Sequence, residues 1–148
     1  MKSPVSAPLR VAFYAPFKPL GHPNPSGDLV IATGLVNYLR RQGVRVAVAS
    51  SLRARWVYRR PTAWLPALAA YRRAQRFCRG WRPHLWLTYH TYYKAPDLLG
   101  PGVCRTQKIP YLVFQGIYST KRRRRLKTAP GFHLNRRALR RAHHLFTN

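Results

Sequence analysis

The side chains best suited to chemistry stand where apolar runs of the sequence end. His90 closes the run Leu85–His90, and Gln115 closes the run Tyr111–Gln115. An imidazole can exchange a proton near neutral pH, whereas an amide can only form hydrogen bonds. We therefore predict His90 and Gln115 as catalytic positions. His90 would orient a hydroxyl group or stabilise developing charge, and Gln115 would be limited to hydrogen bonding.

A glycine-bearing turn precedes the first helix pattern. Ser26, Gly27 and Asp28 close a loop rich in proline and glycine, Pro16–Asp28. A glycine lets the backbone approach a ligand closely, and a helix N-terminus attracts phosphate oxygens. We predict that these three residues contact a substrate or its phosphate. The alternative is that Gly27 only makes a turn and that Ser26 or Asp28 caps the helix.

Four further polar residues follow the third and fourth predicted strands. They are Lys94, Asp97, Tyr118 and Lys121, and we include all four as candidate contacts to substrate or phosphate. For Asp97, capping of the next helix is the preferred interpretation. No metal is expected, because the two cysteines, Cys78 and Cys104, lack the spacing of a metal site and are read as small apolar fillers.

Apolar runs and helix-type spacings predict the elements that hold these residues. Strands are expected at Leu9–Ala15, Val44–Ala49, Leu85–His90, Tyr111–Gln115 and Leu145–Asn148. Helices are expected from Ile31 to Leu39, from Trp64 to Gly80, at Asp97–Thr106 and at Leu134–Ala142. This alternation predicts an α/β fold with a single Rossmann-like, doubly wound, mostly parallel sheet over residues 1–148. The loop that ends at Asp28 and the strand that ends at His90 should then meet at one edge of the sheet.

The charge is extreme, with 28 Lys and Arg against 2 acidic residues and a formal net charge of +26. Such a chain is expected to need an anionic neighbour: nucleic acid, an acidic lipid surface or an acidic protein. Two isolated cysteines exclude a disulfide-rich secreted module, and no apolar run reaches the ~20 residues of a bilayer-spanning helix.

The basic segments favour a peripheral location at the inner face of the membrane. Met1–Leu9 has no hydrophobic signal sequence, so a cytoplasmic location is expected. Lys121–Lys127 is the densest run of positive charge, and the aromatic residues Trp56, Tyr58 and Trp64 lie among arginines. Cations and interfacial aromatics favour contact with anionic lipid headgroups, although a solvated loop is the default interpretation of the basic run.

Five segments, in this order, resemble the N-terminal domain of GT-B-fold, retaining glycosyltransferases of the family-4 type. They are YAPFKPLGHPNPSGD, LVNYLRRQGVRVAVAS, RPHLWLTYHTYYKAPDLLGP, KIPYLVFQG and ALRRAHHLFTN. The resemblance implies transfer of a sugar from a nucleotide-sugar donor to an acceptor, without a further cofactor. It also places the Pro25–Asp28 loop near the donor diphosphate, in a cleft between two domains.

The family's second domain, which holds most of the donor and carries a Glu-x7-Glu motif, has no counterpart here, because the chain contains no Glu. By resemblance the chain is expected to be the acceptor-side half and to need a separate donor-binding domain for activity. Two other functions stay open. One is a basic nucleic-acid-binding module, supported by composition but by no known recognition motif. The other is a folded, non-catalytic remnant or partner subunit.

Overall fold

The computed structural model describes residues 7–147 and contains one five-stranded sheet in which every pair of strands is parallel. The spatial order is β2-β1-β3-β4-β5, formed by β1 (Arg10–Tyr14), β2 (Arg45–Ser50), β3 (Leu85–Thr91), β4 (Tyr111–Gly116) and β5 (His144–Phe146). The helices are α1 (Gly27–Arg41), α2 (Trp64–Trp81), α3 (Gly100–Gln107) and α4 (Ala129–Arg141). Short 3-10 helices lie at η1 (Val57–Arg59), η2 (Pro61–Ala63) and η3 (Thr120–Arg124). This Rossmann-like α/β fold confirms the predicted fold class.

The first β-α-β unit follows from local signals in the sequence. Ser26 is the N-cap of α1, and its hydroxyl accepts a hydrogen bond from the Leu29 amide at 3.3 Å. Asp28 lies in the first turn, where a negative charge suits the helix dipole. After the helix, Gly43 adopts a φ of +81°, which is favourable for a residue without a Cβ. Of the two residues predicted as possible caps, Ser26 is therefore the N-cap of α1.

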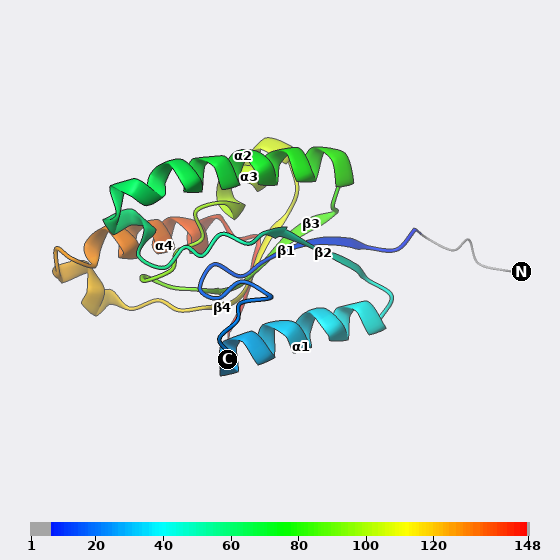
Figure 1. Ribbon diagram of the computed structural model, residues 1–148, viewed down its shortest axis with the longest axis horizontal. Helices are drawn as coiled ribbons and strands as arrows, with labels where there is room; N and C mark the ends of the chain where they lie inside the picture. The colour runs from blue at the N-terminus through cyan, green and yellow to red at the C-terminus, as the bar shows by residue number, and fades with distance from the viewer. Residues whose placement is uncertain (1–6, 148) are drawn as a thin grey trace, which may run out of the picture.

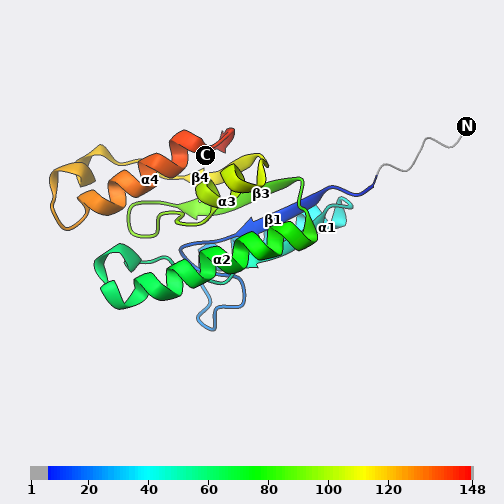
Figure 2. The same ribbon diagram turned by 90° about the horizontal axis from the view of Figure 1, so that it is seen from above.

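Helices cover both faces of the sheet unequally. In Figure 1, α1 lies below the sheet and α2, α3 and α4 lie above it; Figure 2 shows the upper layer from its own side. Side chains alternate along β1, so that Val11 and Phe13 pack in the core with α1, whereas Ala12 and Tyr14 pack in the core with α2 and α3. The sheet is thus doubly wound, with a hydrophobic core on each face.

The chain changes direction across the sheet between β1 and β3. From β1 the chain passes through α1 to β2 on one side, and from β3 it passes through α3 to β4 on the other. In open parallel sheets, ligands bind beyond the carboxyl ends of the strands at such a switch point. The loops that follow β1 and β3 are therefore the segments of interest for function.

Two helices begin elsewhere than the sequence pattern predicts. α3 begins at Gly100, three residues after the expected Asp97, and α4 begins at Ala129, five residues before the expected Leu134. Each helix carries a proline, Pro101 or Pro130, in its first turn. Proline is tolerated there because the first amides of a helix have no intrahelical acceptor.

The end of α2 and the basic connections also differ from expectation. α2 continues through Gly80 to Trp81, and Arg82, with a φ of +51°, makes the left-handed turn instead of glycine. Leu68 of this helix is 45% exposed. η3 begins one residue before Lys121–Lys127, the basic run whose default interpretation is a solvated loop, and extends into it. The predicted absence of a signal sequence concerns Met1–Leu9, of which Met1–Ser6 lie outside the described residues, as does Asn148 of the last predicted strand.

Within the described part of the chain, β5 forms one edge of the sheet and pairs only with β4. Its three residues are all classed as exposed; Leu145 and Phe146 retain 39% and 42% of their accessible surface. Phe146 packs against Phe114 of β4, with 5.9 Å between ring centroids, on the face of the sheet that carries α1.

Candidate functional site

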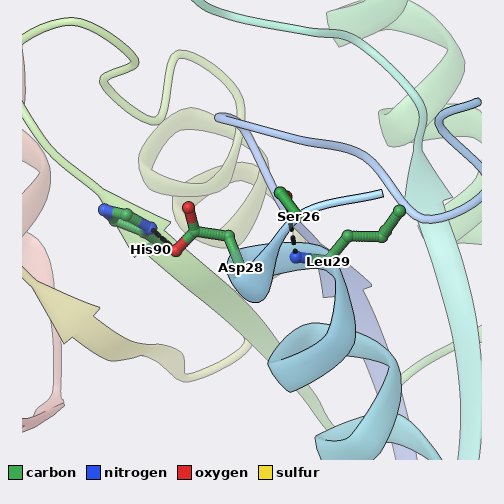
Figure 3. A network of polar contacts seen from close by, with 4 residues as sticks. All are labelled: Ser26, Asp28, Leu29 and His90. Atoms are coloured by element: carbon green, nitrogen blue, oxygen red, sulfur yellow. Dashed lines mark hydrogen bonds and ion pairs between the residues drawn. The ribbon is translucent and has the colours of Figure 1, made fainter. Parts of the chain in front are cut away.

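The loop after β1 and the end of β3 meet through one polar contact. Asp28 Oδ1 lies 2.8 Å from His90 Nδ1, and Figure 3 shows the two side chains directed toward each other from α1 and β3. The side chain of His90 is 11% exposed and that of Asp28 is 30% exposed. The predicted meeting of these two segments at one edge of the sheet is therefore confirmed.

This contact fixes the role of each imidazole nitrogen. An ionised carboxylate only accepts hydrogen bonds, so Nδ1 of His90 is the donor to Asp28. In the neutral imidazole, the other nitrogen, Nε2, then carries the lone pair. Nε2 is buried and has no hydrogen-bond partner within the described residues. A carboxylate that orients a histidine in this way leaves Nε2 able to accept a proton or a hydrogen bond from a ligand.

Aromatic side chains surround His90. Phe17, from the loop after β1, lies 5.3 Å from the imidazole between ring centroids, and Tyr92 lies 5.1 Å from it. Tyr89 approaches edge-on at 5.9 Å. These rings shield the imidazole of His90 from bulk water, whereas the Asp28 side chain remains partly exposed.

Two further buried side-chain atoms near this cluster have no hydrogen-bond partner among residues 7–147. They are the hydroxyl of Tyr89 and Nε of Arg55, whose guanidinium carbon lies 5.9 Å from the Phe17 ring centre. Burial, reinforced by the charge of Asp28, raises the pKa of Tyr89 to about 12. Tyr89 therefore keeps its proton at neutral pH and remains a hydrogen-bond donor. Buried polar groups in native proteins are normally paired, so these three atoms mark this neighbourhood as the candidate site.

The backbone is unusual at the two predicted catalytic positions. His90 has a φ of +55° and Gln115 a φ of +64°. They occupy equivalent places on adjacent strands, because Tyr89 pairs with Phe114 and Thr91 pairs with Gly116. Left-handed conformation costs a residue with a Cβ about 1–2 kcal/mol, and such costs concentrate at functional positions. Gln115 nevertheless forms no hydrogen bond with the Asp28–His90 pair.

Asp97 lies apart from this site, in the interior. It is 3% exposed, and its Oδ1 accepts hydrogen bonds from the amides of Leu99 at 2.9 Å and Gly100 at 2.8 Å. Its Oδ2 accepts from the hydroxyls of Thr88 at 2.5 Å and Tyr111 at 2.8 Å. Burial raises the pKa of Asp97, and these hydrogen bonds oppose the rise. The preferred interpretation, that Asp97 serves the start of a helix, agrees with this geometry.

The remaining predicted contacts lie at the margin of the site or beyond it. Nζ of Lys94 lies 5.9 Å from the Trp56 ring centre and 5.8 Å from that of Tyr93. Tyr118 is 51% exposed and packs against Phe132 at 5.3 Å, and Lys121 is exposed in η3. None of the three is hydrogen-bonded to Asp28 or His90. Ser26 contributes through its cap, and Gly27 is exposed at the helix start.

Sequence reasoning missed Phe17, Arg55, Tyr89 and Tyr92. Tyr89 and Tyr92 lie within two residues of His90 in the sequence, and Phe17 lies three residues after the end of β1, so their positions near strand ends could have identified them. Arg55 stands in a segment with several arginines and gives no such signal.

Comparisons with protein-family models, with curated proteins and with solved structures found no match to this chain. Among residues 7–147, no helix has the length and apolarity needed to cross a membrane. Over the same residues, no group of three or more His, Cys, Asp or Glu side chains is placed to hold a metal ion. The site is thus characterised by its own geometry: an oriented histidine, a helix N-terminus and an aromatic lining.

Proposed function

We propose that this chain is the acceptor-side domain of a glycosyltransferase, which positions a hydroxyl group for attack on a sugar supplied by a nucleotide-sugar donor. The observation that carries the proposal is the Asp28–His90 pair at 2.8 Å, located at the switch point of a Rossmann-like sheet. Nε2 of His90 would accept the hydrogen bond of the acceptor hydroxyl. Asp28 would stabilise the imidazolium that forms if the proton is transferred.

The surroundings of the pair suit a polar ligand with apolar faces. Phe17 and Tyr92 offer ring surface, and Tyr89 offers a hydroxyl donor. Sugars present this mixture, because their rings have C–H faces as well as hydroxyl groups. The exposed Gly27 at the N-terminus of α1 lets a diphosphate approach the first amides of the helix.

The proposal includes a partner and a cellular location. A separate donor-binding domain would hold the nucleotide, and catalysis would require both domains. We place the activity in the cytoplasm, where nucleotide-sugar donors and anionic membrane surfaces are both within reach.

The proposal is tested by NMR titration of the full chain, labelled with ¹⁵N. Hexoses and polyols are added as acceptor probes, and inorganic pyrophosphate is added as a diphosphate probe. We expect acceptor probes to shift the His90 imidazole nitrogens and pyrophosphate to shift the amides at the start of α1. The acceptor probes should also shift the backbone amides of Tyr89 and Tyr92. This response should be lost in His90→Asn and kept in His84→Asn, the matched control just before the start of β3. Probes that leave both sites unchanged, or that act equally on His90→Asn, would refute the proposal.

A further inference from the structure

Two exposed segments at the carboxyl edge of the sheet carry bulky apolar side chains among cations. The first is the start of α2, where Trp64, Leu65 and Leu68 are 57%, 77% and 45% exposed. The second is the basic run that contains η3, where Leu126 is 93% exposed. We call these two segments together the rim; its cations are Arg59, Arg60, Lys121, Arg123, Arg124, Arg125 and Lys127, all exposed.

Both parts of the rim lie at the same end of the molecule. Figures 1 and 2 show the start of α2 and the segment before α4 at the left of the molecule in both views. The loop that follows β3 connects them. Tyr58, just before α2, donates a hydrogen bond of 2.8 Å to the Tyr93 carbonyl, and the guanidinium of Arg122 lies 4.7 Å from the Tyr93 ring centre.

The rim adjoins the candidate site through consecutive aromatic rings. The imidazole of His90 lies 5.1 Å from the Tyr92 ring, and Tyr92 lies 5.5 Å from Tyr93. Tyr93 in turn lies 6.2 Å from Trp56, over which Arg59 is placed at 4.8 Å. A series of neighbouring rings therefore links the Asp28–His90 pair to the cations of the rim.

No carboxylate among the described residues compensates the rim. The two acidic residues of the chain are Asp97, which is buried, and Asp28, which is paired with His90. Two copies of the chain would repel each other at this surface, so its partner must be anionic. The exposed apolar side chains distinguish between the classes of anionic partner. Leucine side chains gain nothing from phosphates or from stacking on bases, but they gain free energy by entering the boundary between headgroups and acyl chains.

We propose that the rim docks on an anionic lipid bilayer and holds the Asp28–His90 site at the level of the headgroups. The cations contact acidic headgroups, while Trp64, Leu65 and Leu126 enter the interfacial layer. The docking surface is independent of the proposed function. Only the further consequence, that the acceptor hydroxyl belongs to a molecule carried at headgroup level, rests on it.

The test measures co-sedimentation of the full chain with vesicles of phosphatidylcholine alone or mixed with phosphatidylglycerol. We expect binding to the mixed vesicles only. The triple variant Trp64→Ser, Leu65→Ser, Leu126→Ser keeps the net charge and should weaken this binding about tenfold or more. The control Leu9→Ser, Tyr38→Ser removes exposed apolar side chains near the opposite edge of the sheet and should bind like the wild type.

A second pair of variants examines the charges. Replacing Arg123, Arg124 and Arg125 by glutamine should weaken binding more than the same replacement of Arg73, Arg76 and Arg79, which are exposed on α2. Equal losses in the two variants would mean diffuse attraction and would overturn the proposal. Circular dichroism of every variant checks that the fold is kept.

A third measurement places Trp64 in the bilayer. Vesicles with brominated acyl chains should quench tryptophan fluorescence of the wild type and quench Trp64→Phe less. Unchanged quenching would contradict insertion of this residue.

A single-stranded oligonucleotide tests the alternative partner. If the triple variant weakens binding of the oligonucleotide but leaves vesicle binding unchanged, the rim is a nucleic-acid surface and the lipid proposal is wrong. Because no sugar is present, failure here leaves the test of the sugar-transfer proposal unaffected.

Discussion

Replacing Asp28 by asparagine should change the imidazole of His90 more than it changes the fold. A hydrogen bond to a charged group contributes about 1.5–3 kcal/mol and a neutral one about 0.5–1.5 kcal/mol. Loss of the negative charge from the first turn of α1 removes a further amount of about 0.3–1 kcal/mol. Since the Asp28 side chain is 30% exposed, we expect a total loss of unfolding free energy of about 1–2 kcal/mol.

Ser26→Ala provides the matched comparison, because loss of this N-cap should cost a similar amount of about 1 kcal/mol. The hydroxyl of Ser26 bonds only to the Leu29 amide and does not contact His90. Urea unfolding followed by circular dichroism should therefore rank the two variants close together. The ¹⁵N shifts of the His90 imidazole should separate them: Asp28→Asn loses the preference for the Nδ1–H tautomer, and Ser26→Ala keeps it. Imidazole shifts of Asp28→Asn equal to those of the wild type would refute the orienting role of Asp28.

Further predictions concern the interior. Burial raises the pKa of Asp97 above the unfolded value of about 3.9, so the native state binds more protons than the unfolded state. The free energy of unfolding should therefore fall as the pH rises from the unfolded pKa through the higher folded pKa. Asp97→Asn should lack this pH dependence when urea unfolding is measured at several pH values. The variant should also lose about 1–3 kcal/mol of unfolding free energy, because a buried donor is left without an acceptor. An unchanged pH dependence in the variant would mean that Asp97 is not its source. A methyl group at Gly131 would overlap the Tyr93 carbonyl and the Tyr58 hydroxyl, so Gly131→Ala should lose about 1–3 kcal/mol of stability, whereas Gly34→Ala, with open space around it, should gain about 0.5–1 kcal/mol. Burial raises the pKa of Cys78 to about 11 and that of Cys104 further, so neither thiol should react with a disulfide reagent at neutral pH until the protein is denatured; rapid labelling of the folded chain would contradict this burial.

The strands and the first helix could be predicted because their signals are local. Apolar runs predicted β1 to β4 within one residue at each end, and Gly43 marked the turn after α1. The starts of α3 and α4 could not be read in this way. Proline and glycine in their first turns conceal a helix from spacing arguments, although proline suits that position.

The meeting of Asp28 with His90 was predictable at the level of the sheet edge but not of the atoms. Parallel strands bring their carboxyl ends together, which places the two residues near each other. The two side chains meet at 2.8 Å, and His90 has a left-handed backbone that a histidine in the sequence does not predict. Arg55 joins the site through packing against Phe17, a long-range contact without a local signal.

The exposed edge strand β5 has a consequence for behaviour in solution. Within residues 7–147 the outer side of β5 has no strand partner, and a free strand edge that carries leucine and phenylalanine can pair with a strand of another molecule. Mutual repulsion between chains of net charge +26 opposes such pairing at low ionic strength. At 1 M salt the Debye length falls to about 3 Å, and that protection is lost. We expect concentrated salt, often used to keep basic proteins free of contaminating polyanions, to promote self-association of this chain through β5.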